Sequence, residues 1–275
     1  MKLKKKYIHN NKRQIFRLLP TNTGKIIIEE RETEKKLAYF NCLEIDSGKK
    51  IFKNLQLDEK FWLGIEAVNN DIIFFHRFTK PDMPQHNGII AFDINDQKVI
   101  WQDDDKTFLF IKDEKVYTFQ QMFEDRKYFA LDYQTGEVIE EPGNDSVSIN
   151  ILREEVIASE DFSSYLFPQK FGSSIIVNET ANQFLKSLRE AHLVSGSIEY
   201  VLKDNLLLFN FHEINRDNSL KNIFKAVDLS KGKYILEETL NSSTNAFAPD
   251  SFFVKDNLLF LLIERIKVGV YEIVF

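Results

Sequence analysis

Short apolar segments separated by tight polar turns recur along this 275-residue chain. The clearest copies are residues 111–117, 202–207 and 254–259, and the weaker copies are residues 20–25, 68–72 and 152–156. Each copy joins the end of one apolar segment to the start of another through a few polar residues, which is the pattern of a β-hairpin. The pattern therefore predicts an all-β fold built from antiparallel hairpins.

The first polar residue of each turn recurs at a nearly constant interval. Successive turns lie 48, 43, 41, 50 and 52 residues apart, at Thr21, Asn69, Lys112, Arg153, Lys203 and Lys255. Repeats of this length are typical of propeller blades, which bury their apolar faces against one another. We therefore predict six repeats of about 47 residues each.

A second pattern marks the later part of several repeats. An apolar strand ends at Asp93, Asp132 or Asp228, and four residues later comes Gln97, Gly136 or Gly232. Glycine at that place permits the left-handed turn that reverses the chain into a further strand. One repeat is then four strands joined by short turns, and the chain is predicted to be a six-bladed β-propeller of four-stranded antiparallel blades.

Both ends of the chain are expected to meet in one blade. The last repeat has only three apolar segments, near residues 251–254, 258–264 and 268–275, whereas residues 3–8 belong to no repeat. Residues 3–8 are therefore predicted to pair with the last repeat as its outer strand, which removes an exposed sheet edge. This closure makes residues 1–275 a single propeller domain.

Residues 145–200 fit the repeat least well. Residues 148–152 and 156–159 read as strands, but residues 181–191 place Phe184, Leu185 and Leu188 at helical spacing. A short inserted helix is expected over residues 181–191. Its apolar stripe is expected to pack on the host sheet rather than to bind a partner.

The repeat also carries a partial family signature. The pattern Ala-x-Asp-x-x-x-Gly-x-x-x-Trp is matched by Ala91, Asp93 and Trp101, with Gln97 in the glycine place. Two further copies lack the tryptophan: Ala130, Asp132 and Gly136, then Ala226, Asp228 and Gly232. The chain thus resembles quinoprotein-type propellers, and as a whole it looks like an uncharacterised bacterial family whose domain has no assigned function. The active-site residues that accompany the quinone in those enzymes are not found, so we expect no cofactor.

Composition narrows the classes of partner. The net charge of −6 works against binding to nucleic acid or to anionic membranes. The lysine-rich start is not followed by the apolar stretch of a secretion signal, and one cysteine, Cys42, is expected to be a buried thiol. We expect a cytoplasmic monomer that binds neither nucleic acid nor a membrane.

Candidate chemistry gathers near the second repeat. Residues 78–87 are predicted to form a long loop, stiffened by two prolines, at the face where propeller ligands enter. The candidate ligand-binding residues in and around this loop, and at one equivalent strand end elsewhere, are Trp62, Glu66, His76, Arg77, Lys80, Asp82, His86 and His212.

Three interpretations of these residues are open. In the first, His76, Asp82 and His86 bind a metal or act as acid and base. In the second, the basic residues and the histidines hold an anionic or peptide ligand, with Trp62 as a stacking surface. In the third, the loop serves only packing and its histidines are satisfied by the backbone.

The second interpretation leads our expectation of function. It describes a non-catalytic binding or scaffold protein that presents a polar face to a protein segment or a small molecule. The alternative is a propeller enzyme, a hydrolase or lyase, which uses His76, His86 and a carboxylate with or without a metal. We assign no catalytic residue and no metal ligand from the sequence.

Overall fold

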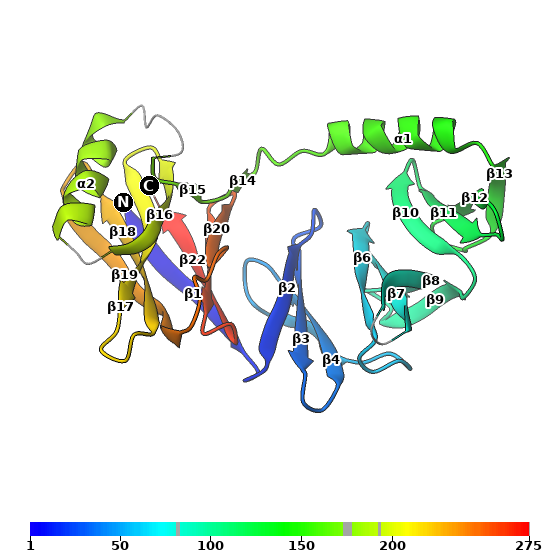
Figure 1. Ribbon diagram of the computed structural model, residues 1–275, viewed down its shortest axis with the longest axis horizontal. Helices are drawn as coiled ribbons and strands as arrows, with labels where there is room; N and C mark the ends of the chain where they lie inside the picture. The colour runs from blue at the N-terminus through cyan, green and yellow to red at the C-terminus, as the bar shows by residue number, and fades with distance from the viewer. Residues whose placement is uncertain (81–82, 173–177, 192–193, 275) are drawn as a thin grey trace. The chain divides into compact units, whose positions relative to one another are not determined.

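The computed structural model describes residues 1–80, 83–172, 178–191 and 194–274. Its strands form five sheets, and two helices accompany them (Figure 1). The chain divides into two compact units, of which one contains Met1–Gln14, Asp46–Gly48 and Phe162–Phe275, and the other contains Ile15–Ile45 and Lys49–Asp161. The predicted all-β architecture of several four-stranded antiparallel sheets is confirmed.

The unit that contains Ile15–Ile45 and Lys49–Asp161 has three four-stranded sheets, each in chain order. The first contains β2 (Gln14–Pro20), β3 (Lys25–Glu32), β4 (Leu37–Glu44) and β5 (Lys50–Leu55). The second contains β6 (Leu63–Asn69), β7 (Ile72–Lys80), β8 (Met83–Asp93) and β9 (Lys98–Asp103). The third contains β10 (Thr107–Lys112), β11 (Lys115–Gln121), β12 (Arg126–Asp132) and β13 (Val138–Gly143).

The first two of these sheets bury one apolar core between them. Phe40 of β4 meets Phe75 of β7 edge to face, with ring centroids 4.8 Å apart. Cys42 is fully buried in the same core, as predicted. This packing fixes the sheet that carries most of the candidate residues.

The other unit has two sheets of five strands. One has the order β15 (Gln169–Lys170), β16 (Val194–Lys203), β17 (Leu206–Ile214), β18 (Leu220–Asp228) and β19 (Lys233–Thr244). The other has the order β1 (Lys2–Asn10), β22 (Lys267–Val274), β21 (Leu258–Ile263), β20 (Phe252–Lys255) and β14 (Tyr165–Leu166).

The predicted pairing of the two chain ends is confirmed. Strand β1 lies antiparallel to β22, with Leu3 opposite Ile273 and Ile8 opposite Gly269 (Figure 1). The N-terminal strand is therefore the outer strand of the last sheet.

Local turn chemistry accounts for the hairpins that the sequence predicted. Thr21, Asn69, Lys112, Lys203 and Lys255 each lie at or beside a tight turn between two consecutive strands.

The aspartate turns are also as expected. The carboxylate of Asp93 accepts hydrogen bonds from the backbone N–H groups of Asn95 and Asp96, both at 2.8 Å. Gln97, Gly136 and Gly232 all have positive φ, so Gln97 does occupy the glycine place.

The prediction of strands at residues 148–152 and 156–159 is wrong, because these residues form the helix α1 (Ser146–Ser159). The Asp145 side chain caps the helix by accepting a hydrogen bond from the Ser148 N–H at 3.0 Å. Ile149, Leu152 and Val156 follow one another at helical spacing and pack on the third sheet. The turn predicted at residue 153 therefore does not exist, and with five sheets among the described residues the sixth blade is not confirmed.

The helix predicted at residues 181–191 is confirmed as α2 (Glu179–Ala191). Its buried residues, Ala181, Leu185 and Leu188, pack against a core that includes Phe209 of β17. Within the described residues, neither helix combines the length and the apolar composition that crossing a membrane would require.

Candidate metal centre

The segment predicted as a long loop is mostly an extended hairpin. Strands β7 and β8 continue their pairing far beyond the predicted strand ends, with Phe78 opposite His86 and Lys80 opposite Met83. The prediction of a ten-residue loop at residues 78–87 is therefore wrong. The loop was predicted because of its two prolines, but Pro84 lies within the strand β8.

Three side chains from three neighbouring strands converge on this hairpin. Glu66 of β6, His76 of β7 and His86 of β8 place one potential ligand atom each within 4.8 Å of the other two. His86 Nδ1 lies 2.6 Å from Glu66 Oε1, and His76 Nδ1 lies 3.0 Å from the same oxygen. One carboxylate oxygen is thus in contact with two imidazoles.

Irregularities in the strands aim these side chains. Glu66 lies at a register shift in β6, where Ile65 pairs with Phe75 but Ala67 pairs with Phe74. The extra residue of such a bulge turns its side chain away from the regular alternation. The Arg17 guanidinium donates a hydrogen bond to the Ile65 carbonyl and so helps to hold the bulge in place.

A second register shift, between β7 and β8, lies beside His76. Phe75 pairs with Ile90 and Arg77 with Asn87, so His76 faces a bulge of two residues that includes Gly88 with φ of 70°. Glycine suits this positive φ because it has no Cβ.

His76 is the most buried member of the cluster, with an exposed fraction of 3%. Its contact with Glu66 lacks the alignment of a hydrogen bond, and neither ring nitrogen has a hydrogen-bond partner among the described residues. A buried polar atom without a partner costs about 1–3 kcal/mol, and such an atom often marks the place of an ion or water. The buried His76 ring therefore points to a ligand, because its 3.0 Å contact with Glu66 is not an aligned hydrogen bond and Nε2 has no partner among the described residues.

Gly64 defines which edge of His76 can bind that ligand. It lies opposite His76 on β6, and a Cβ atom added to it would be 2.8 Å from His76 Cε1 and 2.9 Å from Nε2. The Nε2 edge therefore rests against the β6 backbone. Nδ1, which faces Glu66, is the nitrogen left for a ligand.

The cluster has the charge that a dication requires. Burial of Glu66 opposes its ionisation, but the contacts with His76 and His86 outweigh this effect and lower the pKa of the carboxyl group. Two imidazoles and one carboxylate form a donor set typical of zinc and related divalent transition metals.

Accommodation of one ion requires a small movement of His86. Tetrahedral zinc with ligands at its usual bond lengths sets the ligand atoms about 3.3 Å apart, so the 2.6 Å separation of His86 Nδ1 and Glu66 Oε1 must widen by about 0.7 Å. The His76 and His86 rings are stacked with centroids 3.5 Å apart and 8° between their planes, and one ion cannot lie in both planes. His86 is 37% exposed, so its side chain has room for this movement.

Aromatic side chains border the cluster. Phe78 meets His76 and His86 edge to face, at centroid distances of 5.0 Å and 5.4 Å. Trp62 packs edge to face on Phe78 at 6.5 Å and on Phe61 at 5.0 Å. Trp62 therefore supports the apolar wall through its ring contacts with these phenylalanines.

The basic candidate Arg77 has a partner already. Its guanidinium forms an ion pair with the Asp104 carboxylate, which follows β9. Asn87 donates to the backbone carbonyl of Asp104 at 2.9 Å, so the same residue ties β8 to this turn.

Three candidates remain. Asp82 lies outside the described residues, and Lys80 is described only by its backbone, as the last residue of β7 opposite Met83. His212 belongs to β17 in the other unit, where its Nε2 accepts a hydrogen bond from the Ala248 N–H at 3.2 Å.

Among the described residues, the structure brings together Glu66, His76 and His86, whereas the metal interpretation from the sequence named His76, Asp82 and His86. From the sequence, Glu66 was a candidate ligand-binding residue on the preceding strand, but the metal interpretation did not include it. Its spacing carries no metal signature, because the ligands come from three strands whose bulges cannot be recognised from residue types alone.

The chain has low sequence identity to the solved structures that it is similar to. No curated protein sequence matches this chain. Its fold is similar to the solved structure of a europium-containing methanol dehydrogenase, at 13% identity with a TM-score of 0.33, over 96% of this chain and 52% of the other. The chain therefore spans about half the length of that enzyme.

Two further structures show similar levels of likeness. The Dos1 propeller has 12% identity and a TM-score of 0.32, over 94% of this chain and 67% of the other. KlHsv2 with loop 6CD replaced by a Gly-Ser linker has 11% identity and a TM-score of 0.30, over 92% and 78%.

One protein family matches part of the chain. Residues 19–101 match the family described as Domain of unknown function (DUF4905). The matched range includes Glu66, His76 and His86. The expected resemblance to a family without an assigned function is thereby confirmed for residues 19–101.

Proposed function

We propose that this protein binds one divalent transition-metal ion, of the zinc type, through Glu66, His76 and His86. The observation that carries the proposal is the buried His76 ring, whose nitrogens have no hydrogen-bond partner among the described residues although Nδ1 faces a carboxylate and a second imidazole. A metal bond to Nδ1 gives that nitrogen a partner, while Nε2 stays against the β6 backbone. The proposal departs from our sequence-based expectation of no cofactor.

The proposal retains the expected role of a binding protein and gives it a ligand. The polar anchors for an anionic or peptide ligand find less support, because Arg77 is paired with Asp104 and Trp62 packs on phenylalanines.

Titration calorimetry with zinc chloride tests the proposal on the chelator-treated, intact protein. We expect one ion per chain, and we expect binding to disappear in His76→Ala, His86→Ala and Glu66→Gln. The matched control is His212→Gln, which removes a histidine of the other unit and retains an acceptor for the Ala248 N–H. Absence of zinc binding in the parent protein, or equal binding in all variants, contradicts the proposal.

The three-ligand set favours one second candidate, a metal-dependent hydrolase. Catalytic zinc sites use three protein ligands and leave a further position for water. Zinc-dependent hydrolysis of bis(p-nitrophenyl) phosphate or p-nitrophenyl acetate, lost in His86→Ala, would support the enzyme. If the metal binds without any such turnover, the binding role stands alone.

A further inference from the structure

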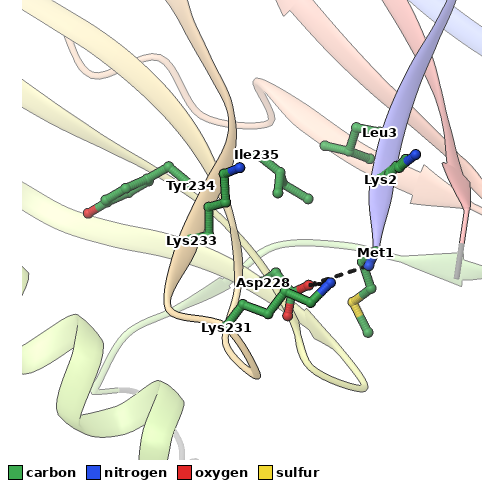
Figure 2. Close-up of a pocket in the computed structure, with 8 residues that line it drawn as sticks. All are labelled: Met1, Lys2, Leu3, Asp228, Lys231, Lys233, Tyr234 and Ile235. Carbon is green, nitrogen blue, oxygen red and sulfur yellow. Dashed lines mark hydrogen bonds and ion pairs between the residues drawn. The ribbon is translucent and has the colours of Figure 1, made fainter.

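A cavity of about 420 Å³ lies in the unit that contains both chain ends. Its walls are the start of β1 on one side and the turn from β18 into β19 on the other (Figure 2). The lining residues are Met1, Lys2, Leu3, Asp228, Lys231, Lys233, Tyr234 and Ile235. Its volume falls in the range of about 300–1,000 Å³ that small-molecule sites have in proteins.

One part of the lining is apolar. Met1, Leu3 and Ile235 pack against the core cluster that contains Phe224 and Leu259. Figure 2 shows the Leu3 and Ile235 side chains extending toward one another from β1 and β19. This surface continues the core of the unit and suits the hydrocarbon portion of a ligand.

The other part of the lining is cationic. Lys2, Lys231 and Lys233 contribute three ammonium groups against a single acid, Asp228. This local excess is opposite in sign to the net charge of −6 of the whole chain. A concave surface lined by one sign of charge concentrates small ions of the other sign.

The single acid of the cavity is already occupied. One carboxylate oxygen of Asp228 accepts hydrogen bonds from the Ser230 hydroxyl and N–H, at 2.5 Å and 3.1 Å. The other is paired with the Met1 amino group at 3.3 Å and with Lys231 Nζ at 3.8 Å (Figure 2). Asp228 therefore anchors the walls of the cavity, and Lys2 and Lys233 are the lysines of the lining that do not pair with it.

We infer that this cavity binds a small organic anion with an apolar portion, of the chemical class of a medium-chain carboxylate. The acid group lies among Lys2, Lys231 and Lys233, and the hydrocarbon portion covers Met1, Leu3 and Ile235. This site is formed by one unit and the metal cluster by the other, so each of the two proposals can be tested independently of the other.

A titration with sodium octanoate, followed by methyl NMR of the methionines, tests the inference directly. Met1 lines the cavity, whereas Met122 is an exposed residue of the other unit. We expect a saturable shift of the Met1 methyl signal and no shift of the Met122 signal. A chelator should leave this response unchanged, which separates it from the metal proposal.

Two comparison ligands separate the charged and the apolar contributions. Inorganic phosphate has the charge without the chain, and 1-octanol has the chain without the charge. Both should bind at least about tenfold more weakly than octanoate, because each lacks one of the two contacts. Equal binding of phosphate, or equal binding of octanol, would overturn the assignment.

Paired variants test the lysines. Lys231→Gln with Lys233→Gln should weaken octanoate binding at least about fivefold, by loss of two of the three ammonium groups. The control pair is Lys35→Gln with Lys49→Gln, at side chains of the other unit that are 71% and 76% exposed. If the first pair impairs folding, Lys233→Gln alone should still weaken binding. Unchanged affinity in a folded variant contradicts the inference.

Discussion

His76 and His212 hold similar positions in different sheets, yet their surroundings differ. Both lie on a strand that follows the first hairpin turn of its sheet, and their exposed fractions are 3% and 4%. His212 Nε2 accepts a hydrogen bond from the Ala248 N–H, and its ring packs edge to face on Phe247 at 5.2 Å. His76 has no such backbone partner among the described residues and instead faces Glu66 and His86.

The contrast separates two roles of a buried histidine. A ring that is satisfied by the backbone serves packing, which is the third interpretation that the sequence left open, and His212 fits it. A ring held beside a carboxylate without an aligned hydrogen bond is suited to bind a metal ion, and this is the role that we propose for His76. Burial alone does not distinguish the two, whereas the partners of the ring nitrogens do.

The largest expected difference between the two histidines concerns zinc affinity. His76→Ala should weaken zinc binding at least about 100-fold, because it removes a ligand and not merely an outer contact. Zinc at 100 times its Kd raises the free energy of unfolding of the parent protein by about 2.7 kcal/mol. Urea unfolding with and without zinc should show this gain in the parent and in His212→Gln, but not in His76→Ala. An equal gain in all three proteins would break the comparison.

A smaller loss of zinc affinity is expected when all three ligands are kept and only the backbone position that packs against His76 is changed. Gly64→Ala places a Cβ 2.8 Å from His76 Cε1 and displaces the ring. Zinc affinity should fall by about tenfold, the lower end of the effects seen for residues that orient a metal ligand. Gly269→Ala is the matched control, since it also adds a methyl group to a strand glycine with ordinary φ but lies in the other unit. Calorimetry should find the zinc affinity of Gly269→Ala unchanged. An equal loss of zinc affinity in both variants would contradict the role of Gly64 in positioning His76.

In the metal-free protein, replacing His212 should lower the free energy of unfolding more than replacing His76, the reverse of their order for zinc affinity. His212→Leu leaves the Ala248 N–H without its acceptor and should lower the free energy of unfolding by about 1 kcal/mol or more. His76→Leu removes two unpartnered nitrogens and should cost less than His212→Leu or even stabilise the chelator-treated protein. Urea unfolding measures both. A greater loss in His76→Leu would show that the His76 ring is already satisfied in the metal-free protein.

The smallest effect concerns pH. Burial lowers the pKa of His212 below its ordinary value of 6.5, so the folded protein binds fewer protons there than the unfolded chain. Stability is therefore unaffected well above pH 6.5 and falls as the pH drops below 6.5 toward the lowered pKa. His212→Gln keeps an acceptor but cannot titrate, so part of the loss between pH 7.5 and 5.5 should vanish. Identical pH profiles of the two proteins in urea unfolding would contradict this account.

Local chemistry made much of the fold predictable. Hairpin turns such as those at Lys203 and Lys255 depend on a few adjacent residues, and so does the aspartate turn that starts at Asp93. The pairing of β1 with β22 followed from counting strands in the last repeat. The same polar turn signal failed at Arg153, because apolar residues at helical spacing and the cap from Asp145 favour a helix there.

The candidate site was less predictable because it depends on register. His76 and His86 were recognised as a pair, but the sequence does not reveal the bulge that brings Glu66 to them. The hairpin that replaces the expected loop also depends on pairing across strands, as between Phe78 and His86. Non-local pairing of this kind leaves no signature at any single position.

Anomalous diffraction at the zinc absorption edge, from crystals of the zinc-loaded intact protein, tests the central claim most directly. We predict one strong peak bounded by Glu66, His76 and His86, with His76 Nδ1 about 2.0–2.1 Å from the ion and the His86 ring rotated out of its stack. A zinc-saturated crystal with no peak at these residues, and with the two imidazoles still stacked, would contradict the account.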